Sequence, residues 1–116
     1  MLTPEGIAAA EALAGRLASA EPRPAVVLSS PLVRTRQTAA ILGDALGARV
    51  LVDTRLAPGA TAPGLLAALG GLTGPVVTVG HQPDCSAIVA ELTGQAVVFP
   101  PAGSYAIELD LPDAAA

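Results

Sequence analysis

The sequence contains no lysine and no tryptophan, and it has a single histidine and a single cysteine. A lone cysteine excludes an internal disulfide, which agrees with a reducing cytoplasm. The six arginines are scattered and the net charge is −4, so there is no basic stripe of the kind that binds nucleic acid. No apolar run approaches the roughly 18 residues that a membrane span needs, and no charged segment precedes an apolar core. We therefore expect a cytoplasmic protein that binds neither nucleic acid nor a membrane.

The residues that are abundant are small and aliphatic. Of the 116 residues, 52% are hydrophobic and only 14% are charged, so disorder is not the expectation. With aromatics nearly missing, the core has to be built from leucine, valine, isoleucine and alanine. The length fits one domain, which we place at residues 1–111, followed by a tail at 112–116.

One stretch in the first half of the chain is typical of a buried strand that runs directly into a helix. The apolar run at 25–28 predicts a strand covered on both faces. Ser30 is a good N-cap and Pro31 a good first helical residue. The helix is expected to reach Leu46 and to stop at Gly47 in a left-handed conformation. Such a strand–helix junction directs free N–H groups and a positive dipole end toward the sheet edge, which favours an anion.

The two arginines of this helix fall on different faces. Helical spacing puts Arg34 in the first turn, on the flank of the buried face to which Thr35 and Ala39 belong. Arg36 falls on the outer face and is expected to be solvated. Taken from this helix alone, Arg34 is as well explained as an ordinary surface arginine as it is as part of the anion site.

Other segments complete an alternating pattern of strands and helices. A second buried strand ends just before His81, and proline opens the helix that follows, which repeats the layout around Ser30. Two such units in one parallel sheet would bring Arg34 and His81 to the same edge, where open α/β sheets bind ligands. The remaining predicted elements are helices beginning at Thr3, at Pro63 (to Leu72) and at Pro83 (to Leu92), and strands at 49–52, 76–79, 95–99 and 104–111.

The motifs in this order resemble the histidine phosphatase superfamily, which has the phosphoglycerate-mutase-like fold. Its second signature resembles Ser29-Ser30-Pro31-Leu32-Val33-Arg34-Thr35-Arg36-Gln37-Thr38 of this chain. The other matching segments are Leu2-Thr3-Pro4-Glu5-Gly6, Asp53-Thr54-Arg55-Leu56 and Gly80-His81-Gln82-Pro83-Asp84. The spacing is most similar to that of the short, single-domain phosphohistidine phosphatases. The resemblance implies a three-layer α/β/α fold with a mostly parallel sheet.

The family's first signature, a strand that ends in Arg-His-Gly, has no match in these residues. In the family, its histidine accepts the phosphoryl group, whereas the only histidine here is His81. The resemblance therefore implies a fold that lacks its first strand, with a gap facing the apolar strands at 26–28 and 76–79. On this basis we expect the chain as given to lack turnover, and to be marginally stable, aggregation-prone or completed by a partner unless two copies pair across the gap.

The resemblance also implies roles for three residues. Arg34 and His81 would be catalytic, because both would hold the phosphoryl group and stabilise its charge. Ser30 would add a phosphate contact. The substrate would be a phosphohistidine in a protein or a small phosphoester, with no cofactor and no metal. Asp53 and Asp84 are the carboxylates near strand ends, but neither is a convincing general acid, which suits an imidazole leaving group.

Less specific interpretations compete with each of these roles. His81 taken by itself is better explained as a structural histidine at a strand end. Cys85 lies near a helix N-terminus, where a thiol can become a nucleophile, yet it also belongs to an apolar stripe with Ile88 and Leu92, which predicts burial. Arg55 is expected to pair with Asp53. At the level of function, the alternative is a non-catalytic module that binds phosphate or a phosphopeptide.

Overall fold

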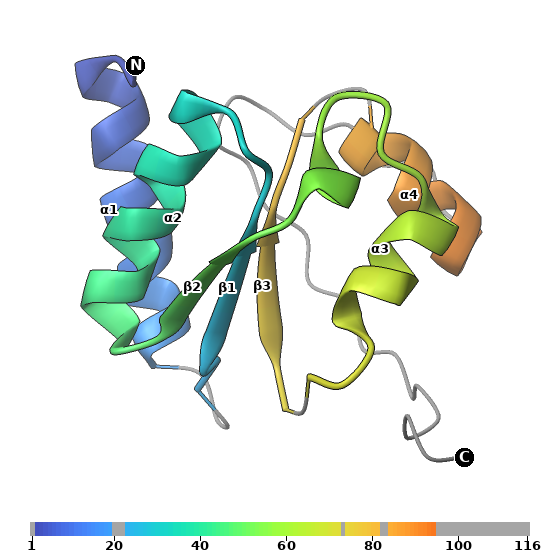
Figure 1. Ribbon diagram of the computed structural model, residues 1–116. Helices are drawn as coiled ribbons and strands as arrows, with labels where there is room; N and C mark the ends of the chain where they lie inside the picture. Colours follow the sequence, from blue (N-terminus) through green and yellow to red (C-terminus); the bar gives the residue numbers. More distant parts are fainter. Residues whose placement is uncertain (1, 20–22, 73, 82–83, 95–116) are drawn as a thin grey trace.

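The computed structural model describes residues 2–19, 23–72, 74–81 and 84–94. In these ranges four α-helices, three strands and one short 3-10 helix alternate along the chain (Figure 1). Their bounds are α1 Pro4–Ala18, β1 Val26–Ser29, α2 Val33–Leu46, β2 Arg49–Val52, η1 Thr54–Leu56, α3 Ala62–Leu69, β3 Val76–Val79 and α4 Asp84–Thr93.

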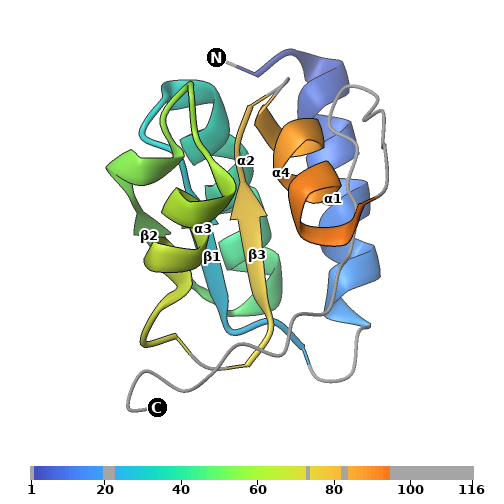
Figure 2. The same cartoon turned by 90° about the vertical axis from the view of Figure 1, so that its right-hand side faces the viewer.

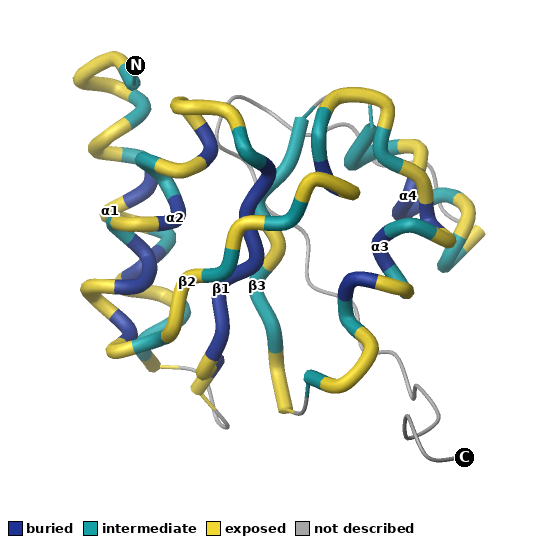
Figure 3. The backbone as a smooth tube through the Cα atoms, in the orientation of Figure 1, coloured by how far each residue is buried: buried dark blue, intermediate teal, exposed yellow. Residues whose placement is uncertain are grey.

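The three strands form a parallel sheet in the order β2-β1-β3. β1 is the central strand, and its last residue, Ser29, is level with Val52 of β2 and with Val79 of β3. All four residues of β1 are buried, and it is the most continuously buried strand in Figure 3. Because parallel strands end at the same edge, the segments that follow them meet there, at the top of Figure 1.

Helices cover both faces of the sheet, so the predicted three-layer α/β/α architecture with a parallel sheet is confirmed. α1 and α2 lie on one face and α3 and α4 on the other, and Figure 2 views the molecule from the side of α3 and α4. Adjacent residues of β1 contribute to two separate hydrophobic cores, one on each face of the sheet. Val27 packs with Ala39 and Leu42 of α2, and Leu28 packs with Leu65 of α3. The period of two along a strand sends these neighbours to opposite faces.

Local capping chemistry accounts for several helix ends. Thr3 Oγ1 accepts a hydrogen bond from the Gly6 N–H at the start of α1, with Pro4 in the first turn. Gly47 ends α2 with φ 64°, the left-handed conformation that the sequence predicts. The predicted strands at 49–52 and 76–79 are confirmed with the same bounds, but the predicted burial of β3 is wrong. Its valines are half-buried and Thr78 is exposed, because within the described ranges β3 lies at an edge of the sheet. The predicted strands at 95–99 and 104–111, and the tail at 112–116, lie outside the described residues.

The start of α2 differs from the expectation. The helix begins at Val33, its N-cap is Leu32, and no side chain caps it. Ser30 is therefore not the N-cap and Pro31 is not the first helical residue. The Ser30 hydroxyl contacts Thr35 and His81 instead. Its distance from the Leu32 N–H nitrogen is 3.4 Å, which is long for a hydrogen bond.

The expected gap, which was to face the strands at 26–28 and 76–79, does not lie beside β1. No described strand pairs with the outer edge of β3, so that part of the expectation stays a prediction. β1 is hydrogen-bonded to β2 along one edge and to β3 along the other, so no strand can be inserted next to Val26, Val27 or Leu28. Within the described ranges, the outer edges of the sheet belong to β2 and β3. None of the helices in these ranges has the length and hydrophobicity that crossing a bilayer would require.

Two helical glycines give a matched test of the packing between α2 and β2. A Cβ on Gly43 would lie 2.6 Å from Val50 Cγ2, whereas a Cβ on Gly15 of α1 would have no neighbour within 4 Å. Both substitutions to alanine gain about 1 kcal/mol of helix propensity, but only Gly43→Ala adds overpacking of about 1–3 kcal/mol. Urea unfolding should therefore show Gly15→Ala to be the more stable variant by about 1–3 kcal/mol. Equal stabilities would contradict the close α2–β2 contact.

Candidate functional site

Two of the three predicted site residues meet at the carboxyl edge of the sheet. Ser30 follows β1 and His81 follows β3, two residues after Val79. The Ser30 N–H donates to the Val79 carbonyl at 3.0 Å, which continues the β1–β3 ladder by one step. This places Ser30 Oγ 2.6 Å from His81 Nε2. Parallel pairing of two neighbouring strands thus joins residues that lie 51 positions apart in the sequence.

Ser30 is fully buried and its hydroxyl contacts a second side chain. Thr35, in the first turn of α2, is 6% exposed, and its Oγ1 lies 2.6 Å from Ser30 Oγ. Thr35 Oγ1 also lies 3.1 Å from the Ser30 carbonyl oxygen and 2.9 Å from the Leu32 carbonyl oxygen. The site therefore contains a chain of hydrogen-bonding groups that runs from α2 through Ser30 to the imidazole of His81.

Arg34, the third predicted residue, is close in sequence but is not held in this network. It lies in the first turn of α2 and is exposed, as is Arg36 on the same helix. Within the described part of the chain, the Arg34 guanidinium makes no hydrogen bond or ion pair. An exposed arginine one residue before Thr35 has its donors free for an anion at this edge.

Asp84 connects the site edge to the segment before α3. It lies in the first turn of α4, as the sequence predicts. Its Oδ2 accepts a hydrogen bond from the Gly59 N–H at 2.8 Å and another from the Ala60 N–H at 3.2 Å. Gly59 has φ 97°, a conformation that favours glycine. The Asp84 carboxylate therefore connects the start of α4 to the segment before α3 by accepting two backbone hydrogen bonds.

The other carboxylate near a strand end is paired, as predicted. Asp53, after β2, makes a salt bridge with Arg55 at 2.7 Å. Hydrogen bonds from the Arg55 side chain and backbone lower the pKa of Asp53, and Asp53 in turn raises the pKa of Arg55. A carboxyl group with a lowered pKa is ionised at neutral pH and is unsuited to act as a general acid.

The predicted burial of Cys85 is confirmed in part, because the residue is half-buried in α4. Burial raises the pKa of the Cys85 thiol, and the neighbouring charge of Asp84 raises it further. At neutral pH the group is a thiol, and the thiolate is the nucleophilic form. The geometry thus favours the packing interpretation of this cysteine over the nucleophilic one.

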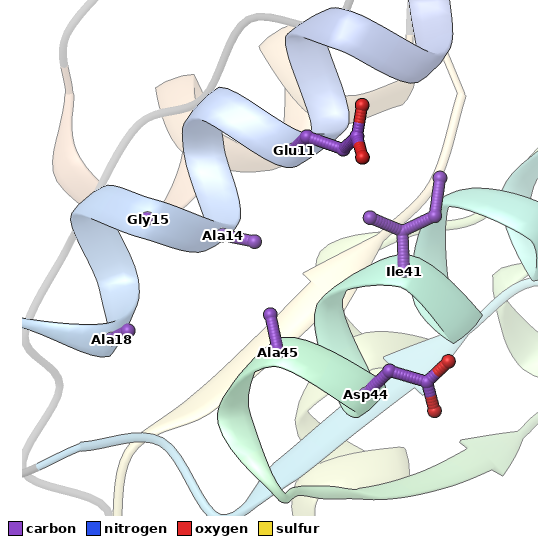
Figure 4. Close-up of a pocket in the computed structure, with 7 residues that line it drawn as sticks. All are labelled: Glu11, Ala14, Gly15, Ala18, Ile41, Asp44 and Ala45. Carbon is purple, nitrogen blue, oxygen red and sulfur yellow. The ribbon is translucent and has the colours of Figure 1, made fainter.

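A groove between α1 and α2 lies away from these residues. It has a volume of about 560 Å³ and is lined by Glu11, Ala14, Gly15, Ala18, Ile41, Asp44 and Ala45 (Figure 4). Its only charged groups are the two carboxylates, which would repel an anion. Across residues 2–19, 23–72, 74–81 and 84–94, no cluster of three histidine, cysteine or acidic side chains is placed to hold a metal ion.

Sequence reasoning missed two contributors to this edge. Thr35 was assigned only to the buried face of its helix, and its contact with Ser30 depends on the chain turning between β1 and α2. The tie from Asp84 to Gly59 spans 25 residues, and no local pattern signals it. The contact runs from the Thr35 side chain back to Ser30, five positions earlier at the end of β1, and it depends on the folded turn between them.

Comparison with known proteins places these features in a family. The profile of the histidine phosphatase superfamily (branch 1) matches residues 1–58, which include β1, α2 and Ser30. Among curated proteins, none matches the chain significantly.

Solved structures match over most of this chain. A protein assigned as the phosphohistidine phosphatase SixA of Agrobacterium tumefaciens is 29% identical with a TM-score of 0.69, covering 81% of this chain and 62% of its own. The corresponding protein of Nakamurella multipartitia is 35% identical with a TM-score of 0.67, covering 78% and 53%. A mycobacterial glucosyl-3-phosphoglycerate phosphatase is 27% identical with a TM-score of 0.63, covering 81% and 68%. The chain thus spans between half and two thirds of the length of the first two.

Proposed function

Because this chain belongs to the histidine phosphatase superfamily, branch 1, we propose that it binds the transferred phosphoryl group in a phosphatase reaction at the edge where Ser30 and His81 meet. The observation that carries the proposal is the 2.6 Å contact between Ser30 Oγ and His81 Nε2. It holds the imidazole beside the start of α2, where the first N–H groups of the helix and Arg34 favour an anion.

His81 and Arg34 have electrostatic roles in this proposal. Phosphoryl transfer depends mainly on positioning the group and on stabilising the charge of its oxygens. The Arg34 guanidinium would bind two oxygens with its planar fork, and the imidazole of His81 would contact a third. Ser30, which is buried, holds His81 and so acts on phosphate through it.

The substrate class is proposed from the similarity to the SixA proteins, whose names include phosphohistidine phosphatase activity. A phosphohistidine needs little protonation of its leaving group, and this suits an edge whose carboxylates are engaged: Asp53 by Arg55, and Asp84 by two backbone N–H groups. A small phosphoester, as in the glucosyl-3-phosphoglycerate phosphatase, is the other substrate class.

One feature of the sequence favours a second candidate, a phosphate-binding module without turnover. His81 is the only histidine of the 116 residues, and it matches the family motif that stabilises charge, not the motif that accepts the phosphoryl group. The two candidates share the anion site and differ in hydrolysis. To distinguish the two candidates, the purified chain is incubated with p-nitrophenyl phosphate and with a phosphohistidine protein, and hydrolysis is measured. We expect no turnover by these residues alone.

Phosphate binding tests the proposal directly. Because there is one histidine, titration with inorganic phosphate or vanadate should move a single set of imidazole NMR signals. Arg34→Ala should weaken binding by roughly 10–100-fold, the usual value of a charged hydrogen bond. Arg36→Ala is the matched control, since it removes the same charge from an exposed position of the same helix, and it should weaken binding less than about threefold.

Two results would contradict the proposed anion site at Arg34 and His81. If phosphate leaves the imidazole signals unmoved, or if Arg36→Ala abolishes binding while Arg34→Ala does not, the anion site lies elsewhere. Turnover that survives His81→Ala and Cys85→Ser would remove His81 from the catalytic role.

A further inference from the structure

Ser30 Oγ, Thr35 Oγ1 and His81 Nε2 form a chain in which the direction of every hydrogen bond can be worked out. Each hydroxyl has one proton to donate and two lone pairs with which to accept, and a neutral imidazole has one N–H and one acceptor nitrogen. The distances of 2.6 Å from Ser30 Oγ to both partners require one proton in each contact.

The proton of Thr35 is fixed by its carbonyl neighbours. Its Oγ1 lies 2.9 Å from the Leu32 carbonyl oxygen and 3.1 Å from the Ser30 carbonyl oxygen, and a carbonyl oxygen can only accept. If Thr35 donated to Ser30 Oγ instead, its lone pairs would face two carbonyl oxygens with no proton between them in a buried site, which is unfavourable. Thr35 therefore donates to a carbonyl group, and its contact with Ser30 Oγ is made by the Ser30 proton.

With its proton directed to Thr35, Ser30 Oγ meets His81 as an acceptor. The Leu32 N–H, 3.4 Å away, approaches the same oxygen as a donor, which agrees with this direction. The proton in the Ser30–His81 contact must then be on Nε2. His81 Nδ1 makes no hydrogen bond within the part of the chain that the structure describes, so it is the nitrogen left to exchange a proton.

We propose that Thr35 is a positioning residue that fixes the proton of His81 on Nε2 by orienting the Ser30 hydroxyl. Ser30 is thereby excluded as a nucleophile activated by His81, because such a pair needs the hydroxyl proton directed at the imidazole. If the proposed phosphate site is correct, Nδ1 is the atom that faces the phosphoryl oxygens, and it contacts an oxygen dianion as a donor only in the imidazolium form.

The test reads the two ring nitrogens of His81 by ¹⁵N NMR in the uniformly labelled chain, at a pH above the ring titration. The single histidine gives one pair of signals. In the unsubstituted protein we expect Nε2 to be of the protonated type and Nδ1 of the unprotonated type. A protonated Nδ1 would overturn the proposal without any variant, so the test holds even where a variant does not fold.

Three variants assign the effect to the Thr35 hydroxyl. Thr35→Val keeps the shape but removes the hydroxyl, which frees the Ser30 proton for His81, so the protonated signal should move toward Nδ1. Thr35→Ser restores the hydroxyl and should restore the original pattern. Thr38→Val is the matched control on the same helix, because among the described residues the Thr38 hydroxyl bonds only to the Arg34 carbonyl, and it should leave both signals unchanged.

An unchanged tautomer in folded Thr35→Val would overturn the role of Thr35. No phosphate is needed for these measurements, so their outcome is independent of the proposed function. Phosphate added to the same sample then reports on that function separately, and failure to bind would leave the assignment of the Nε2 proton intact.

Discussion

Leu28→Ala is expected to lower the free energy of unfolding by about 2–5 kcal/mol, because it opens a cavity in the central strand. Leu28 is 2% exposed and packs against both η1 and α3 through Leu56 and Leu65. Small domains have about 5–15 kcal/mol of stability in total, so this single change could leave the fold barely populated at 37 °C. The measurement is the urea midpoint followed by circular dichroism.

Leu32→Ala is the control for that prediction. It removes the same atoms from a leucine that is 45% exposed, four residues further along the chain. We expect a loss within about 0.5 kcal/mol, as for surface substitutions. Equal effects of the two variants would mean that Leu28 is not at the centre of the core, and the sheet order would have to be revised.

Asp84→Ala is expected to release the segment around Gly59 from the site edge. The carboxylate accepts two backbone hydrogen bonds, from Gly59 and Ala60, and such charged hydrogen bonds contribute about 1.5–3 kcal/mol each in favourable sites. Without it, amide hydrogen exchange at these two residues should accelerate by roughly 10–100-fold, while the amides of β1 should exchange as before.

The comparison variant for Asp84 is Asp53→Ala. Asp53 is the other carboxylate after a strand of the sheet, but among the described residues its side chain bonds only to Arg55, in an exposed pair. Exposed pairs contribute little to stability, and we expect exchange at Gly59 and Ala60 to stay unchanged. Acceleration in both variants would indicate that the whole edge opens together and that Asp84 has no specific role.

The position of Asp84 also bears on the proposed function. Its two hydrogen bonds fix Gly59 and Ala60 relative to the start of α4, three positions after His81 in the sequence. Release of that segment should therefore also broaden the imidazole signals of His81. A variant that changes exchange at Gly59 without changing His81 would separate the loop from the phosphate site.

Local chemistry explains why much of the fold could be predicted. The valine-rich runs at 49–52 and 76–79 become strands with the expected bounds, since β-branched residues favour strands. Gly47 ends α2 because only a residue that tolerates positive φ fits that position. Thr3 and Pro4 begin α1 for equally local reasons. The ion pair of Asp53 and Arg55 is likewise made between neighbours.

Ser30 shows where local reasoning fails. Its type and its place before a proline favour an N-cap, yet its hydroxyl is shared with Thr35 and His81, and α2 begins at Val33 without a side-chain cap. The contacts with a half-buried imidazole and a buried hydroxyl replace the cap. A preference of about 1 kcal/mol for capping was outweighed by two short contacts that exist only in the folded chain.

The sequence by itself determined the elements, their alternation and the residue types at the carboxyl edge, because propensity, capping and hydrophobic period act over a few neighbouring residues. Only the tertiary structure decided the order β2-β1-β3, which closes both edges of β1. It alone also decided the meeting of Ser30 with His81, 51 positions away, and of Asp84 with Gly59, 25 positions away. The physical reason is that strand order is selected by burying both faces of β1 at once, and this depends on all four helices together.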